Sequence, residues 1–226
     1  HRVADIFSGP TASYAGSFTE VGDHVVFGAT SSADSKRQLW VTDGTEAGTT
    51  ALTNIAFGVS DDGVQFIGAV PGADLAVFNV RRSSGNRDVY ATDGTVAGTQ
   101  IIHTFTDGEV YFMKPAGSLT YFSHIGSDSK EIWRTDGTAA GTLLLKSFNG
   151  VQSPELLGEI NGKMIFNGTT IAEGQELWIS DGTVAGTTLL RDVNPGSGSG
   201  RPYNEAIYGG RMYVSIEEPT HGRELW

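Results

Sequence analysis

The residues that could do chemistry in this sequence are concentrated in a phrase that recurs along the chain. Four copies are nearly complete, and they read QLWVTDGTEAGT, DVYATDGTVAGT, EIWRTDGTAAGT and ELWISDGTVAGT, beginning at Gln38, Asp88, Glu131 and Glu176. A fifth copy begins at Glu224 and ends with Trp226. The aromatic ring of each copy could stack on the apolar face of a sugar, and the aspartate of each complete copy could ligate calcium.

Both chemical roles have a structural alternative, which we favour. A large aromatic residue that recurs once per repeat within a strand is expected to fill the space between neighbouring sheets. An aspartate commonly accepts a hydrogen bond from its own backbone two positions on, beside a glycine with positive φ. We therefore predict structural roles for the residues at these positions, which are Trp40, Tyr90, Trp133, Trp178 and Trp226, and Asp43, Asp93, Asp136 and Asp181.

Catalytic and metal-binding motifs find little support. The sequence has no Gly-x-Ser-x-Gly elbow and no His-Glu-x-x-His motif, and its five histidines occupy non-equivalent places in the repeats. The acidic clusters at 60–63 and 126–129 are too short for a calcium loop of the EF-hand kind. We predict that the chain is not an enzyme and needs no cofactor, with calcium as an option only for a site built from several loops. A glycoside hydrolase, the weaker alternative, would need two close carboxylates in one deep pocket.

The spacing of the phrase predicts the fold. Its aromatic position recurs every 43 to 50 residues, a period typical of propeller blades with four strands each. In the fourth unit we expect strands at 154–160, 163–167, 176–180 and 188–193, with a tight turn at Asn161 and Gly162. The equivalent second strands are expected at 24–28, 75–79, 119–123 and 211–215.

The two ends of the chain predict how a ring would close. Residues 2–6 align with 189–193, the strand that follows an Asp-Gly-Thr turn, whereas Trp226 lies just before such a turn. We therefore expect an all-β fold, a five-bladed β-propeller with four-stranded antiparallel blades, in which the N-terminal strand completes the C-terminal blade. The single domain, 1–226, divides into units at 9–57, 58–107, 108–150, 151–196, and 197–226 plus 1–8.

Composition excludes several classes of function. The chain has 226 residues, 26 acidic against 15 basic, a net charge of −11 and no cysteine. The absence of cysteine excludes thiol catalysis, zinc fingers and iron–sulfur clusters. Because an acidic surface repels phosphate backbones and anionic lipids, we expect no nucleic-acid partner. We also expect no membrane insertion, because no apolar run is long enough to span a bilayer.

The phrase Glu-Leu-Trp-x-x-Asp-Gly-Thr-x-x-Gly-Thr resembles the repeat of the ELWxxDGT-repeat proteins, a mostly bacterial and exported group. The resemblance covers essentially the whole chain, with mild departures such as Val89 and Tyr90 in the second copy. It implies a repeat-built β-propeller in the extracellular or cell-surface space, and no defined activity. The size and blade number are also similar to the five-bladed tachylectin-type lectins, a likeness of architecture only.

A rigid scaffold with variable polar loops is the usual layout of a binding surface. We expect a non-catalytic, multivalent carbohydrate-binding module, lectin-like or adhesin-like, whose partner is a carbohydrate or cell-surface glycan. The alternative is a protein-interaction or structural module of a larger exported protein, with a protein as its partner. The candidate ligand contacts, all taken from the variable loop face, are Asp34, Lys36, Arg82, Asn86, Asp128, Glu173, Gln175, Tyr203, Glu218 and His221.

Overall fold

The chain folds as β-structure throughout the part described by the computed structural model, residues 1–53, 63–82 and 84–226. This part contains nineteen strands and no helix, and so no helix that could cross a bilayer. Of Asp34 only the backbone placement, in a strand, is described. The acidic cluster at 60–63 lies outside the described residues, apart from Gly63 itself.

The strands form five antiparallel meanders, in which strands consecutive in the chain are neighbours in the sheet. The first contains β1 (Gly16–Val21), β2 (His24–Ser31), β3 (Asp34–Thr42) and β4 (Thr50–Ala51). The second contains β5 (Gly63–Val70), β6 (Leu75–Arg81), β7 (Arg87–Thr92) and β8 (Gln100–Phe105). The third contains β9 (Glu109–Ala116), β10 (Leu119–Ile125), β11 (Lys130–Thr135) and β12 (Leu143–Ser147).

The fourth sheet contains β13 (Glu155–Ile160), β14 (Lys163–Thr170), β15 (Gly174–Ser180) and β16 (Thr188–Arg191), and the fifth has three strands, β17 (Tyr203–Tyr208), β18 (Arg211–Glu218) and β19 (Gly222–Leu225). The prediction of an all-β chain built from four-stranded antiparallel units is therefore confirmed for four units. All four predicted second strands begin at the expected residue and extend beyond the expected end.

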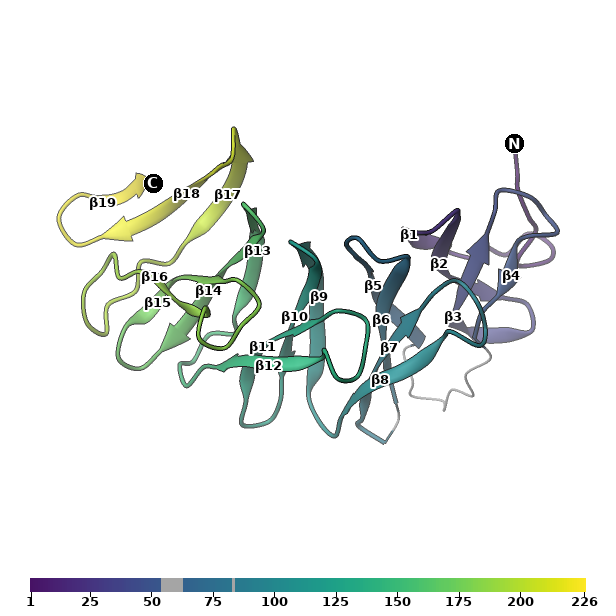
Figure 1. Ribbon diagram of the computed structural model, residues 1–226, viewed down its shortest axis with the longest axis horizontal. Coiled ribbons are helices and arrows are strands. Elements are labelled where there is room, and N and C mark those ends of the chain that lie inside the picture. The colour runs from purple at the N-terminus through teal and green to yellow at the C-terminus, as the bar shows by residue number, and fades with distance from the viewer. Residues whose placement is uncertain (54–62, 83) are drawn as a thin grey trace.

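The five sheets follow one another along an arc (Figure 1). The first strand of each sheet lies on the concave side, and the fourth strand of the four-stranded sheets lies on the convex side (Figure 1). The two termini lie at opposite ends of the arc (Figure 1). Residues 2–6 form no strand and do not pair with β19. They lie instead beside the first sheet, where Val3 and Ile6 line a cavity together with Phe27. The structure thus has the five expected sheets without the expected strand exchange.

The hydrophobic core lies between adjacent sheets, because the central strands bury side chains on both faces. In β6, for example, every residue from Ala76 to Val80 is buried. Leu52, just after β4, packs in one cluster with Phe78 of the second sheet. Phe148, just after β12, likewise packs with Trp178 of the fourth sheet. Each sheet is therefore held to the next by the segment that follows its outer strand.

The Asp-Gly-Thr turns have the same hydrogen bonds in all four copies. In the first, Asp43 Oδ1 accepts from the backbone amide of Thr45 at 2.8 Å and from its hydroxyl at 2.7 Å. The same two bonds recur at the other three aspartates, Asp93, Asp136 and Asp181. The turn glycine, Gly44 in the first copy, has a φ of 89° that a side chain rarely adopts. These short-range bonds explain why the phrase repeats almost letter for letter.

Candidate functional site

The ten predicted ligand contacts are distributed over all five sheets. Seven lie in the connection between the second and third strands of a sheet or at its edges, namely Asp34, Arg82, Asn86, Asp128, Glu173, Glu218 and His221. Lys36 and Gln175 lie within third strands, and Tyr203 begins the innermost strand of the fifth sheet. The structure therefore gathers them only in small local groups, one sheet at a time.

Several of these side chains make bonds to their own loop or to the strand that follows it. Arg82 donates from Nε to Asp88 Oδ2 at 2.8 Å and from Nη2 to the Tyr90 hydroxyl at 2.9 Å. Glu173 accepts from the hydroxyl of Thr170, and Glu218 forms an ion-pair contact with His221. Such bonds shape the loops, and they leave those side chains less available to a ligand.

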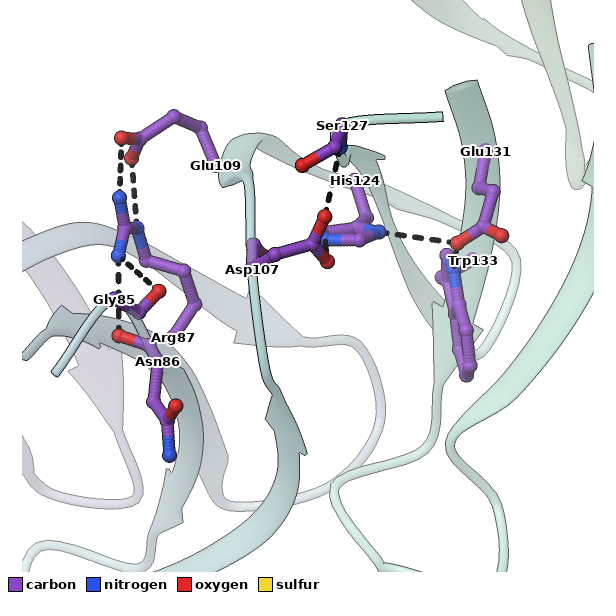
Figure 2. Close-up of polar contacts among 9 residues, drawn as sticks. All are labelled: Gly85, Asn86, Arg87, Asp107, Glu109, His124, Ser127, Glu131 and Trp133. Carbon is purple, nitrogen blue, oxygen red and sulfur yellow. Dashed lines mark hydrogen bonds and ion pairs between the residues drawn. The ribbon is translucent and has the colours of Figure 1, made fainter. Parts of the chain in front are cut away.

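Two buried polar clusters lie between the second and third sheets, at the loop end of their strands (Figure 2). In the first, Arg87 is 3% exposed and forms an ion pair with Glu109 at the start of β9. Its Nη1 donates to the carbonyls of Gly85 at 2.8 Å and Asn86 at 3.1 Å. All three guanidinium nitrogens of this buried arginine donate to the carboxylate or to the two carbonyls, and the ion pair joins the two sheets.

The second cluster surrounds His124, which is 3% exposed. Figure 2 shows its ring between Asp107 and Glu131. The Nδ1 atom lies 3.1 Å from Glu131 Oε2, and Nε2 lies 3.0 Å from the carbonyl of Asp107. Glu131 Oε2 also accepts from the indole of Trp133 at 2.8 Å. Both ring nitrogens therefore have partners within the protein, and the imidazole links the segment before β9 to β11.

The innermost strands carry a different repeated feature. Each of the five sheets has an irregularity in the pairing of its first and second strands. In four of them a residue other than glycine has positive φ at this point, namely Ser17 (59°), Phe66 (42°), Phe112 (52°) and Asn204 (56°). Such a backbone conformation is uncommon and costs of order 1–3 kcal/mol. Bulges of this kind redirect side chains, and here they do so on the concave side of the arc.

The bulges of β1, β5 and β9 border a hollow of about 680 Å³, which we call the inner-strand hollow. Its lining comes from three sheets and consists of Ser17, Phe18, Arg37, Val64, Gln65, Phe66, Ile67, Phe112, Met113 and Lys114. Three phenylalanines are unusually open to solvent: Phe18 is 63% exposed, Phe66 39% and Phe112 41%. The volume is within the range of small-molecule sites, and such sites combine apolar and aromatic walls with a few polar groups.

The charged residues of the hollow are both basic. Arg37 Nη2 donates to the carbonyl of Gly16 at 2.7 Å, and Lys114 Nζ donates to the carbonyl of Leu157 at 3.0 Å. Burial lowers the pKa of the Arg37 guanidinium, but from a value so high that the group stays charged. Among the described residues, no carboxylate lines the hollow. An acidic protein thus presents a positive, aromatic site on its concave face.

None of the residues predicted from the loops lines this hollow. The sequence interpretation missed Phe18, Phe66 and Phe112 because it looked for the site among residues that differ between repeats. A signal was present, since an aromatic residue recurs near the middle of the first strand in each of the first three units. Their exposure depends on the bulges, which strand alternation alone does not predict.

No group of three or more histidine, aspartate or glutamate residues suited to a metal ion is found within residues 1–53, 63–82 and 84–226. The cluster at 126–129 contributes Asp128 alone, and its turn is closed by a backbone bond from Gly126 to Ser129 at 2.9 Å. The calcium option therefore has no supporting geometry in the described residues.

No protein-family model and no curated protein sequence matches the chain. Among solved structures, a prolyl endopeptidase is similar with a TM-score of 0.58 and 13% identity, over 92% of this chain and 32% of that chain. A puromycin hydrolase is similar with a TM-score of 0.56 and 11% identity, over 93% of this chain and 35% of that chain. A puromycin-hydrolyzing peptidase from Mycobacterium tuberculosis is similar with a TM-score of 0.54 and 11% identity, over 97% of this chain and 37% of that chain.

The chain therefore spans about a third of the length of these solved proteins. At identities this low the likeness concerns the fold alone. The shared part is a propeller-like arrangement of antiparallel sheets, so the comparison identifies this chain as a propeller-like module.

Proposed function

We propose that this chain is a non-catalytic module that binds carbohydrate on its concave face, in an extracellular setting. The observation that carries the proposal is the inner-strand hollow, where three exposed phenylalanines from three sheets surround polar side chains. Aromatic faces pack on the apolar faces of pyranose rings, while a few polar groups orient the hydroxyls. Because bulges recur in the other innermost strands, further weak contacts along the arc would add through multivalency.

The experiment that tests this proposal is a glycan-array screen of the purified protein, run with calcium and again with a chelator. We expect binding to a related set of glycans, which persists in chelator because the described residues hold no metal cluster. The variant Phe112→Ala should lose binding, whereas Tyr208→Ala, which removes a more exposed aromatic residue outside the hollow, should keep it. A blank array at high protein concentration, or equal loss in both variants, would contradict the proposal.

We also propose that residues 2–6 complete the fifth sheet and close a five-bladed ring. Val193, which follows β16, packs with Ile216 of the next sheet, and Ile6 is its equivalent in the repeat. The contact of Ile6 with the first sheet is what a strand preceding that sheet would make. By analogy with the pairing of Leu177 and Arg191, Ala4 should lie opposite Leu225.

Ring closure can be tested by a disulfide, since the chain has no cysteine of its own. In a closed ring the double variant Ala4→Cys, Leu225→Cys should form an intramolecular bond on mild oxidation, because paired strands bring Cα atoms within about 5.5 Å. The control Ala4→Cys, Glu205→Cys should remain reduced. Failure of the first pair to cross-link in the monomer would establish the open arc.

A protein-interaction module is the second candidate, and a specific feature favours it. A hollow of about 600 Å³ between the fourth and fifth sheets is lined mainly by apolar side chains, including Leu177, Val214 and Trp226. Trp226 is 37% exposed, and Arg191 lies 4.9 Å above its ring. This surface suits an apolar protein segment better than a sugar. A blank glycan array would make this candidate the leading one.

A further inference from the structure

We infer that the ligand of the inner-strand hollow is an acidic saccharide, a sugar chain bearing carboxylates, bound through Arg37 and Lys114. This inference rests on the proposed carbohydrate-binding function and adds the chemical class of the sugar. It starts from a contrast in charge: the chain has 26 acidic residues for 15 basic ones, yet both charged residues lining the hollow are cations.

Several other arginines of the protein have carboxylate partners. Arg82 pairs with Asp88, and Arg87 pairs with Glu109. Arg37 makes no such pair among the described residues, and its Nη2 donates to the carbonyl of Gly16 and, at 3.4 Å, to the hydroxyl of Ser17. A guanidinium that meets only neutral oxygens in an acidic protein keeps its full attraction for an external anion.

The position of Arg37 is fixed before any ligand arrives. Its guanidinium lies against the backbone of Gly28, where a side-chain Cβ would come within 2.0 Å of Nε. The bond to Gly16 attaches it to β1, next to the bulge at Ser17. A cation held in this way loses little conformational entropy on binding, which favours affinity.

Lys114, on β9 of the third sheet, supplies a second cation to the lining of the hollow. Its ammonium has three donors, and the bond to the carbonyl of Leu157 uses one of them. The other wall residues include Phe18, Phe66 and Phe112. Stacking surfaces and cations thus occur together, and a sugar ring with a carboxylate offers both a flat apolar face and a negative charge.

The test is isothermal titration calorimetry with trigalacturonate and with its fully methyl-esterified form, which has the same ring skeleton without the charge. We expect the acid to bind at least about tenfold more tightly than the ester, as one charge-assisted hydrogen bond would give. Added salt should weaken binding of the acid and leave that of the ester unchanged.

Two lysine variants localise the effect. Lys114→Gln should reduce affinity for the acid about tenfold while leaving binding of the ester unchanged. Lys163→Gln removes the same charge from the exposed first residue of β14, outside the hollow, and should change neither affinity. Circular dichroism of both variants establishes that they are folded, and Arg37 is left intact because it supports β1.

The outcomes separate this inference from the function on which it rests. Equal binding of acid and ester would overturn the acidic class while keeping carbohydrate binding. Binding of neither form, with neutral glycans bound on the array, would also overturn the acidic class, and a blank array as well would remove the proposed function. Binding of triglutamate as tightly as trigalacturonate would overturn the saccharide in favour of an acidic peptide.

Discussion

The Asp-Gly-Thr turns recur in four of the sheets and the bulged inner strands in all five, but the two features recur in different ways. All four complete turns have the same aspartate-to-threonine bonds, with distances that agree within 0.1 Å. The bulges share only their place in the sheet, since the residue with positive φ changes from Ser17 to Phe66 and Asn204. One feature is therefore repeated in sequence and bonding, and the other only in backbone shape.

This difference separates scaffold from site. The turns satisfy their own polar groups and pack against the preceding sheet, as Gly182 does against Leu119. The bulges expose aromatic side chains, and the hollow that they border contains Arg37, which has no carboxylate partner among the described residues. Residues that are strained or exposed without benefit to stability are good candidates for function. Variants of the turns and sheet contacts should then change stability, and variants of the hollow should change binding.

The largest effect on stability is expected from Trp178→Ala. The indole is 6% exposed and belongs to the cluster between the third and fourth sheets, where Phe148 contacts it at 5.3 Å between ring centroids. Its removal should lower the free energy of unfolding by about 3–5 kcal/mol, measured by urea denaturation. Phe112→Ala, which removes an exposed ring, should cost less than about 1 kcal/mol. Similar losses in both variants would break the distinction between scaffold and site.

A smaller effect is expected from a matched pair of turn glycines. Gly44 and Gly182 both have a φ of 89°, but a Cβ at Gly44 would meet nothing within 4 Å. At Gly182 it would lie 2.3 Å from Leu119 Cδ1. Gly44→Ala should cost about 1 kcal/mol from backbone strain, and Gly182→Ala about 1–3 kcal/mol more from overpacking. Equal costs in thermal melts would contradict the open environment of Gly44, because closure of the ring would place the fifth sheet against that turn.

The smallest effect is a dependence of stability on pH. Bonds from threonine lower the pKa of turn aspartates such as Asp43 and Asp181, whereas burial raises the pKa of Glu176. A lowered folded-state pKa gives stability that is present above the ordinary value of 3.8 and lost as the pH falls. For Glu176 the contribution to stability is present at pH values below the ordinary pKa of 4.5, and it is lost as the pH rises through the raised pKa of the folded state.

Urea denaturation between pH 2 and pH 7 checks both signs. Stability should fall as the pH drops below about 4, and Thr183→Val, which removes one bond to Asp181, should reduce that fall. Glu176→Gln should flatten the profile above about pH 4.5. A profile that none of these substitutions changes would show that these carboxylates do not set the acid response.

Much of the scaffold could be predicted from the sequence, because its determinants are local. The tight turn at Asn161 and Gly162 and the second strands follow from residue types a few positions apart. The hollow could not be predicted in this way. Arg37 reaches Gly16 across 21 positions of the chain, and the exposure of Phe112 depends on a bulge and on the neighbouring sheet. Contacts of this kind are set by tertiary packing, which a single sequence does not specify.

The central claim, that ligand binds in the inner-strand hollow, is tested most directly by NMR of methyl-labelled methionine. The chain has three methionines. Met113 lines the inner-strand hollow, and Met164 lies fully buried in the core. Met212 lines the apolar hollow between the fourth and fifth sheets. Titration with a glycan from the array should shift the Met113 methyl signal and leave those of Met164 and Met212 in place. Saturable binding that shifts Met212, or that leaves Met113 unchanged, would contradict the account.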